Sequence, residues 1–536
     1  MQNTFDYIVV GAGSAGCVLA NRLSAGGKYS VCLVEAGPRD RSPFIHIPFG
    51  IIGLIREGRH NWGYYTEPEP HLKNRRLYWP RGKTWGGSSS INAMVYIRGN
   101  PADYDDWAAN GCEGWSWNDL LPVFRSLENN ETWRDSLLHG NAGELNVAEV
   151  REINPLSKTF IEAGREVGYH VNEDFNGVRQ DGVGYYQVTQ KNGLRFSSAK
   201  AFLYPALSRS NLTVESDAVV TRVVVEDGVA RGVEIRQDDQ TRTIGCRKEV
   251  ILCGGAINSP QILLLSGIGP ATELDALGIP VVQDSPGVGK NLQDHLDITV
   301  MINESSKKSI GLSLAALPKS VIDVFKFIFK RKGMLASNAA EAGAFLHLPD
   351  DAQGRPGIQL HFIPSFLRDH GRDLSPGHGC TIHACQLRPR SRGEITLRDK
   401  DPLSHPCIHA NYLSDLKDAE DMIKATRIAR ELFSTKAFSP VNAGEDLPGA
   451  GVQSDAEILE DIRKRAETIY HPAGTCRMGA DEESVVDPKL RVRGVKGLRV
   501  ADASIMPTLI GGNTNAPCMV IGEKCARLVL AEAGMA

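Results

Sequence analysis

The segment IYHPAGTCRMG, residues 469–479, carries one histidine among mainly small side chains. His471 and Cys476 are its side chains with metal-binding chemistry. A metal site needs several ligands that converge, and these two residues alone do not supply them. Two interpretations of His471 therefore remain: a base that takes a proton from a substrate, or a structural histidine in the core.

The residues around His471 predict a loop. Proline disfavours helical geometry in the residue that precedes it, so Pro472 biases His471 away from a helix. Gly474 then gives the chain freedom to turn. We expect this loop to present one imidazole to a pocket, where a neutral histidine has a pKa suited to proton removal.

A glycine-rich turn near the N-terminus predicts a cofactor site, with a plain tight turn between strand and helix as the alternative. In YIVVGAGSAGCVLA, an expected strand at 7–10 is followed at once by Gly11, Gly13 and Gly16, which fit G-x-G-x-x-G. The first glycine makes the turn, the second lets a pyrophosphate approach the backbone, and the third lets the helix pack on the strand. Glu35 ends the next expected strand, where a carboxylate can bind a ribose. The motif does not separate NAD from FAD.

A second glycine-rich loop follows in WPRGKTWGGSSSINAMVY. Gly86 and Gly87, followed by three serines, offer backbone N–H groups and hydroxyls without bulky side chains. Such a loop can wrap a diphosphate or the edge of a ring. The neighbours Trp79, Trp85 and Met94 are apolar, which argues against a flexible linker.

Two further segments read as strand, loop and helix. In EVILCGGAINSPQILLLSGIGP, we expect a helix that begins near Ser259 and Pro260 and ends at Gly267. In GLRVADASIMPTLIGGNTNAPCMVIGEK, we expect a helix with Pro517 near its start.

Composition limits the class of protein. A chain of 536 residues, 42% hydrophobic and 23% charged, is long enough for two or three packed units. A net charge of -4 without a basic tract gives no nucleic-acid footprint. The 11 cysteines are scattered, as expected for reduced thiols. With no run of 18 apolar residues and no signal-peptide pattern, we expect a cytoplasmic protein.

A second unit is expected between the cofactor motifs. Residues 356–398 read as successive strands and residues 415–433 as a helix, which predicts an antiparallel sheet with helices on one side. Glu341, His361 and His383 fall in this part. Structural roles are favoured for each of them, and contact with a pocket is the alternative.

One amphipathic segment, ALPKSVIDVFKFIFKRKG, has two interpretations. Its apolar residues include five on one helical face, namely Leu317, Val321, Val324, Phe325 and Ile328, and two that leave that face, Phe327 and Phe329. Lysines and arginines lie among and after them. A helix packed on the substrate sheet is favoured, and a helix resting on a membrane surface near a quinone pool is the alternative.

Taken together, the four cofactor and helix segments and YHPAGTCRM resemble the glucose–methanol–choline (GMC) family of flavin oxidoreductases. The resemblance runs from Tyr7 to Leu530. Within the family the chain is most similar to bacterial medium-chain alkanol dehydrogenases, with choline dehydrogenases and polyol or polyethylene-glycol dehydrogenases as near relatives. The segments RGKTWGGSSSINAMVYIRG, AETIYHPAGTCRMG and GNTNAPCMVIGEK carry this closer match.

The resemblance implies FAD and a set of residues that hold it. The pyrophosphate would lie on Gly11, Gly13, Ser14, Ala15 and Gly16, and the adenosine ribose on Glu35. The flavin would lie along Gly87, Ser88, Asn92, Ala93, Met94 and Val95. The backbone of Val219 would touch the adenine, and Asp502 and Ala503 would meet the pyrophosphate and ribityl chain. Family members that attach FAD covalently have a histidine where this chain has Ile91, so we expect non-covalent FAD.

The resemblance also assigns the active site. His471 matches the family's catalytic base, and Asn515 matches its partner, which is asparagine or histidine across the family. An amide there can hold an alcohol oxygen and stabilise the developing alkoxide. No metal is implied.

The implied fold is α/β (α+β overall): a Rossmann-type FAD-binding domain with a discontinuous antiparallel-sheet substrate domain. We expect the FAD-binding domain at 1–155, 200–297 and 465–536, and the substrate domain at 156–199 and 298–464.

The implied reaction is FAD-dependent oxidation of primary, medium-chain aliphatic alcohols to aldehydes, with a quinone or another electron acceptor. Oxidation of choline, a polyol or polyethylene glycol, an oxidase reaction that makes hydrogen peroxide, and a hydroxynitrile-lyase-type reaction stay open. Peripheral contact with the inner membrane also stays open.

Overall fold

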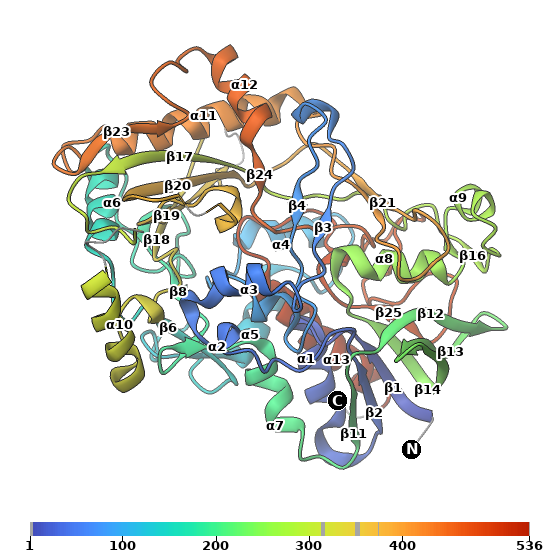
Figure 1. Cartoon of the computed structure of the whole chain (residues 1–536). Coiled ribbons are helices and arrows are strands. Elements are labelled where there is room, and N and C mark those ends of the chain that lie inside the picture. The colour runs from blue at the N-terminus through green and yellow to red at the C-terminus, as the bar shows by residue number, and fades with distance from the viewer. Residues whose placement is uncertain (1–3, 312–316, 349–353, 374, 535–536) are drawn as a thin grey trace.

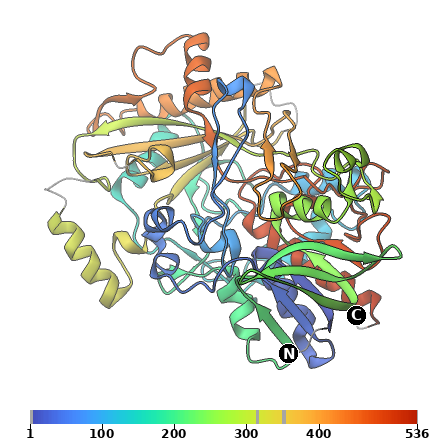
Figure 2. The same ribbon diagram turned by 45° about the vertical axis from the view of Figure 1, so that its right-hand side comes forward.

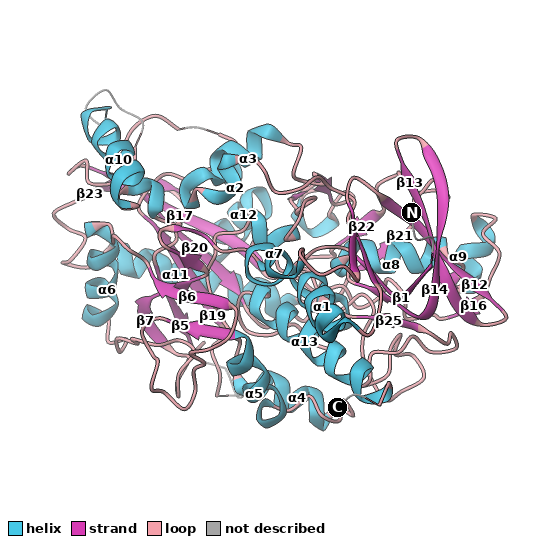
Figure 3. Cartoon of the chain, turned by 90° about the horizontal axis from the view of Figure 1, so that it is seen from below, coloured by secondary structure: helices cyan, strands magenta, loops and turns pink. Residues whose placement is uncertain are grey.

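The computed structural model describes residues 4–311, 317–348, 354–373 and 375–534. Two seven-stranded sheets dominate it, joined by long loops and short strand pairs. They lie on opposite sides of the molecule, with helices α1 (Ser14–Ser24) and α13 (Asn515–Glu532) between them (Figures 1 and 3). The expected α/β fold is therefore confirmed.

The first sheet is parallel through its centre and antiparallel at one edge. Its order is β11-β2-β1-β14-β13-β12, with β25 also paired to β14. The strands are β1 (Thr4–Val10), β2 (Val31–Val34), β11 (Leu212–Glu215), β12 (Val219–Glu226), β13 (Val229–Gln237), β14 (Gln240–Leu252) and β25 (Leu498–Val500). The segments YIVV and VCLV are buried throughout, as expected for parallel strands covered on both faces.

The glycine turn after β1 leads directly into α1, which packs along α13. This contact is close because Gly522 has no side chain: a Cβ there would lie 2.6 Å from the carbonyl oxygen of Ala15. Both helices begin beside the central cavity, so their N-terminal ends face the same space.

The second sheet is antiparallel and comes from later segments of the chain. Its order is β23-β17-β20-β19-β18-β7, with β24 also paired to β17. The strands are β7 (Gly182–Tyr185), β17 (Leu296–Glu304), β18 (Ala342–Leu346), β19 (Ile358–Ile363), β20 (Gly379–Gln386), β23 (Asn442–Leu447) and β24 (Glu467–Thr468). Helices α6 (Pro155–Glu166) and α11 (Leu416–Phe433) pack on this sheet and on each other, and so share one face. The division into five domain segments stays a prediction.

Helix α8 (Gly255–Leu265) begins earlier than the sequence predicted, with Pro260 inside it. Proline cannot donate to the carbonyl four residues back, here that of Ala256. That carbonyl accepts a hydrogen bond from the Thr475 hydroxyl instead, at 2.6 Å. A contact from the loop that carries His471 thus allows the helix to continue through the proline.

Two other expectations need correction. Strand β21 (Glu394–Thr396) pairs with β22 (Cys407–His409) rather than with the substrate sheet. Helix α10 (Leu317–Lys330) does not cover the sheet: its main contact is with the short turn η7 (Met334–Ala336), at the periphery of the molecule (Figure 2). Of the expected apolar face, Val321, Val324, Phe325 and Ile328 are exposed, and Leu317 lies outside the residues whose side chains are described. Phe329 is also exposed, whereas Phe327 is buried.

Candidate active site

A single cavity of about 530 Å³ extends between the two sheets. The predicted site residues that line it are Gly11, Gly13, Ser14, Ala15, Glu35, Gly87, Ser88, Asn92, Ala93, Met94, Val95, Val219, His471, Asp502, Ala503 and Asn515. Gly16 is the predicted residue that does not: a Cβ there would lie 1.9 Å from the Gly11 carbonyl oxygen. Its role is to let α1 approach the turn.

The two glycine-rich loops contact each other at the cavity wall. Gly87 has a positive φ of 51°, and a Cβ on it would lie 2.7 Å from the Cα of Gly13. The N–H of Gly86 donates to the Ala12 carbonyl at 2.7 Å. A Cβ on Gly13 would meet its nearest neighbour only at 3.9 Å, so this residue presents bare backbone to the cavity.

Asn92 fixes the stretch that follows the second loop. Its side-chain oxygen accepts from the Met94 N–H at 3.0 Å and from the Arg195 guanidinium at 2.9 Å. Met94 has a positive φ of 59°, which this contact helps to hold. Arg195 is buried, and burial lowers its pKa to about 9. Sequence reasoning did not identify Arg195, because it lies far from Asn92 along the chain.

Two buried carboxylates brace the turns at the cavity. Glu35 accepts from the N–H groups of Ala12 and Gly37, each at 2.8 Å, and burial raises its pKa to about 7. Asp502 accepts from the Gly255 N–H at 2.8 Å and the Ser259 hydroxyl at 2.6 Å, and burial raises its pKa. Direct contact of either carboxylate with a cofactor stays a prediction.

These features fit FAD. Bare backbone at Gly13 and Gly87 leaves room for a diphosphate and a ring edge, and the N-terminus of α1 favours negative charge. Glu35 lines the cavity at the end of β2, where a ribose is bound in dinucleotide folds. The cavity also extends past these loops to His471, so a bound ring and a substrate could share it.

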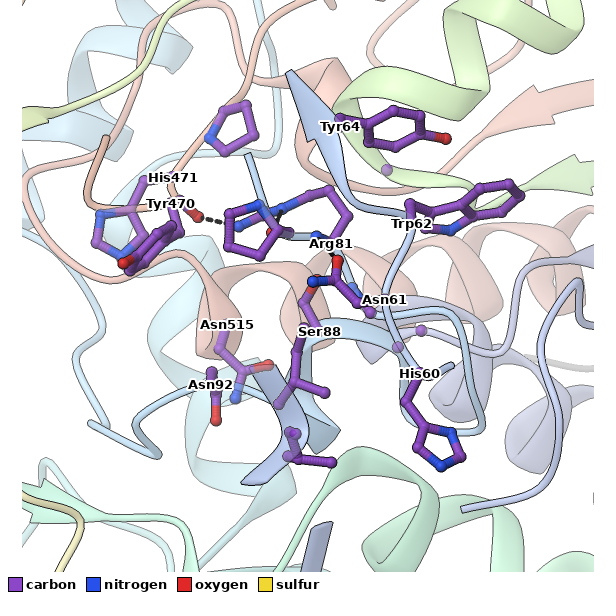
Figure 4. Close-up of a pocket in the computed structure, with 18 of the residues that line it drawn as sticks. His60, Asn61, Trp62, Tyr64, Arg81, Ser88, Asn92, Tyr470, His471 and Asn515 are labelled. Carbon is purple, nitrogen blue, oxygen red and sulfur yellow. Dashed lines mark hydrogen bonds between the residues drawn. The ribbon is translucent and has the colours of Figure 1, made fainter. Parts of the chain in front are cut away.

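His471 is held by its backbone and by a loop with an unusual conformation. Its N–H donates to Asp294 Oδ1 at 2.8 Å. The preceding residue, Tyr470, has a positive φ of 74°, and its carbonyl accepts from Arg81 Nη2 at 2.7 Å (Figure 4). Asp294 also accepts from the hydroxyls of Thr468 and Tyr412. The backbone of the loop is therefore held at Tyr470 and at His471.

The hydrogen bonds of His471 assign its tautomer. Gln359 Nε2 donates to Asn513 Oδ1 at 3.1 Å, so the Asn513 amino group faces His471 Nε2, 3.2 Å away. Nε2 is then the acceptor, and Nδ1 carries the proton and donates to His295 Nδ1 at 3.0 Å. Burial, with the neighbouring His295, His361 and Arg81, lowers the pKa of His471 well below its usual value. His471 is a neutral imidazole with a lone pair at the cavity.

Asn515, predicted as the partner of His471, lies elsewhere. Its side-chain oxygen accepts from the Ser14 hydroxyl at 2.7 Å, at the first residue of α13, and Figure 4 shows it near Asn92. The residue beside His471 is Asn513, in the loop just before the helix. The segment GNTNAP contains both asparagines. Asn513 lies in the loop before α13 and Asn515 is the first residue of the helix, so their side chains point to different places.

His361 and His383 form a cross-strand pair on β19 and β20, and both line the cavity. The sequence had favoured structural roles for them. Glu341 is different: its carboxylate accepts from the Ser337 hydroxyl at 2.6 Å, the Asn154 N–H at 2.7 Å and the Ser157 hydroxyl at 2.8 Å. His295 was not identified from sequence, because nothing local indicates contact with His471.

The described residues contain neither a metal-binding cluster nor a membrane-spanning helix. No group of three or more histidine, cysteine, aspartate or glutamate side chains among them is arranged to hold a metal ion. No helix in the described ranges is both long and apolar enough to cross a bilayer.

Comparisons with known proteins agree on one family. Two models for GMC oxidoreductases, an N-terminal and a C-terminal one, match residues 5–297 and 389–522. Alcohol dehydrogenase [acceptor] from Pseudomonas putida is 51% identical, over 99% of this chain and 97% of that protein. Human mitochondrial choline dehydrogenase is 44% identical, over 98% and 90%. A formate oxidase variant from Aspergillus oryzae, solved in a study of FAD modification, is 28% identical with a TM-score of 0.93 over 99% of both chains.

Proposed function

The chain belongs to the GMC oxidoreductase family, and from this premise we propose that it oxidises primary, medium-chain aliphatic alcohols to aldehydes with FAD. The observation that carries the proposal is the neutral His471, which lies beside Asn513 in the same cavity as the cofactor loops. The relative at 51% identity, named an alcohol dehydrogenase, supports the same reaction class.

Each residue has a defined part in this reaction. A substrate hydroxyl placed between His471 Nε2 and Asn513 Nδ2 donates its proton to Nε2 and accepts from the amide. The Nδ1 contact with His295 keeps the ring turned toward the substrate. When bound, FAD supplies the acceptor for the hydride that leaves the alcohol carbon, and a quinone or another acceptor then takes the electrons.

The cavity lining supports an aliphatic substrate. Apolar residues on it include Phe49, Ile51, Leu54, Met334, Ile363, Phe366 and Leu367. Among the described lining residues the carboxylates are Glu35, Asp373 and Asp502, and two of these brace the cofactor loops. A choline ammonium would need a carboxylate or aromatic rings around it. Glu341, a carboxylate that the sequence places in this half, is occupied by three hydrogen bonds and does not line the cavity.

Choline oxidation is the second candidate, because choline dehydrogenase is 44% identical over nearly the whole chain. A substrate panel that includes choline, polyols and polyethylene glycol separates it from the first. Oxygen consumption with an alcohol tests the oxidase alternative. Cyanohydrin cleavage without loss of flavin colour tests the hydroxynitrile-lyase alternative.

The proposal includes non-covalent FAD. Ile91, at the position where covalent members carry histidine, lines the cavity with a hydrocarbon side chain that cannot bond to the flavin. Acid precipitation of the purified enzyme should leave all of the flavin in the supernatant. Yellow colour in the washed precipitate would overturn this part.

The main test is the visible spectrum of the purified holoenzyme without oxygen, before and after addition of 1-octanol. Bleaching of the oxidised-flavin bands supports alcohol oxidation, and admission of oxygen or a quinone then identifies the acceptor. Unchanged bands with 1-octanol and bleaching with choline would favour the second candidate.

A further inference from the structure

Helix α10 exposes a broad apolar face. The side chains that are 41 to 77% exposed are Val321, Ile322, Val324, Phe325, Ile328 and Phe329. At 3.6 residues per turn they cover an arc of about 160°. Asp323 and Phe327, which are 5% and 4% exposed, point to the opposite side and hold the helix on the protein.

A small number of contacts hold α10 on the protein and set its orientation. Inside the segment, the guanidinium of Arg331 lies 5.1 Å from the centre of the Phe327 ring, and Lys326 pairs with Asp323 at 3.5 Å. Contacts to the rest of the protein include Glu152, which pairs with Lys326 at 3.6 Å and accepts from the Gly333 N–H at 2.6 Å. They also include Arg151, whose Nη1 donates to the Arg331 carbonyl at 3.4 Å. The helix is therefore oriented by the protein, and its exposed face is turned away from the core.

Basic side chains surround this face. Exposed lysines and arginines on the helix and directly after it are Lys326, Lys330, Arg331 and Lys332. Asp323 is the acidic residue within 321–332, and it is buried. This local positive charge stands out in a chain of net charge -4. An apolar arc with a basic border is the pattern of a helix that lies in the headgroup region of an anionic bilayer.

The ends of this segment lead to the cavity. Ile310 and Gly311 before α10 and Met334 after it line the cavity and are half-buried. The turn η7, which contains Met334, also packs against η2 (Pro48–Gly50), and Phe49 lines the cavity as well. A bilayer on α10 would therefore lie beside the cavity wall.

We propose that residues 321–332 dock on an anionic lipid surface and hold this side of the cavity against the bilayer. Docking itself follows from the helix and its charge. Its use, namely entry of an alcohol or quinone from the bilayer, rests on the proposed function. Self-association through the same face is disfavoured, because a symmetric contact would bring the two basic borders together. Figure 2 shows α10 at the outer edge of the molecule, where a flat surface can reach it.

The test is sedimentation of the full-length holoenzyme with vesicles of phosphatidylcholine, with or without phosphatidylglycerol. We expect binding to the anionic vesicles, weakened by salt. Phe325→Ser with Phe329→Ser, and separately Lys330→Glu with Lys332→Glu, should each reduce the bound fraction at least tenfold. Leu137→Ser with Leu416→Ser, which removes two leucines 83% and 81% exposed elsewhere, is the matched control and should bind like the wild type.

Two readouts keep the result independent of folding and of catalysis. Flavin absorbance, and turnover of a water-soluble alcohol with a water-soluble acceptor, should be unchanged in all variants. The proposal is overturned if the wild type does not bind anionic vesicles, or if the α10 variants bind as well as it does. A change of mass in solution for the phenylalanine variant, without loss of vesicle binding, would identify the face as a self-contact instead. Vesicle binding without alcohol turnover would leave docking standing and reject only the proposed reaction.

Discussion

The central residue is a histidine kept neutral by its surroundings. Burial of His471 disfavours its charged form, and the nearby Arg81 and His295 add to this effect. Its Nε2 lone pair faces Asn513, and its Nδ1 proton is held by His295. The arrangement leaves a lone pair at one nitrogen and an orienting contact at the other, as the proposed removal of a proton from an alcohol requires.

The lowered pKa of His471 predicts how activity depends on pH below neutrality. If His471 acts as the proposed base in its neutral form, activity should persist as pH falls through 6.5, the ordinary pKa of histidine, and should be lost only when the lower pKa of His471 is reached. The measurement is kcat/KM for an alcohol between about pH 5 and 8, with samples returned to neutral pH to control for inactivation. A loss of half the activity at or above pH 6.5 would contradict the assignment.

The two asparagines should differ in their effects. Asn513→Ala should lower kcat/KM for the alcohol by about 10²–10³-fold, because it removes the proposed donor to the developing alkoxide. Asn515→Ala breaks the contact with Ser14 and should mainly weaken retention of FAD. Stopped-flow reduction by alcohol and flavin content after dialysis measure the two effects, and a reversed order would return the partner role to Asn515.

At the scale of elements, loops and helix starts position the site. Helix α8 runs through Pro260, and Thr475, four residues after His471, supplies the donor that the Ala256 carbonyl would otherwise lack. Helix α13 starts at Asn515 and so turns this side chain toward α1, while Asn513 stays in the loop beside the base. The His471 loop and the cofactor half are thus joined by side-chain contacts.

Loss of the Thr475 hydroxyl should lower the stability of the protein. Thr475→Val removes the hydroxyl and leaves the Ala256 carbonyl buried without its donor, so the free energy of unfolding should fall by about 1–3 kcal/mol. Thr475→Ser keeps the hydroxyl and should lose less. Denaturant unfolding followed by flavin fluorescence compares the two, and equal losses would show that the hydroxyl is not the cause.

At the scale of the whole molecule, the cavity exists because two sheets from interleaved stretches of chain face each other. The first glycine turn follows β1 of the first sheet, the second glycine-rich loop packs against that turn, and His361 and His383 come from the second sheet. A ligand that fills this space should hold the two halves together.

Removal of FAD should therefore lower the melting temperature of the whole protein. Saturation at about 100 times the dissociation constant adds about 2.7 kcal/mol to the free energy of unfolding of the folded state. Calorimetry of the holoenzyme, of the protein freed of FAD, and of the protein with FAD restored measures this. Recovery of the original melting temperature is the control, and identical melting curves would count against a cofactor in the cavity.

The sequence alone determined the features that depend on local chain geometry. Gly11 and Gly16 predict a turn because only glycine allows the close approaches there, Gly13 leaves bare backbone at the cavity, and Pro517 marks the first turn of α13. Alternating and continuous apolar runs predict the strands of both sheets. Motif order along the chain indicated the family, which the matched residues confirm.

Tertiary structure decided what depends on direction and on distant partners. The choice between Asn513 and Asn515 rests on where α13 begins, and the tautomer of His471 rests on Gln359 and His295, which are remote in sequence. Whether the apolar face of α10 is covered depends on which elements surround it, and residues 321–329 leave most of it exposed. Local patterns fix the backbone of short segments, but side-chain partners and exposure arise only when the sheets meet.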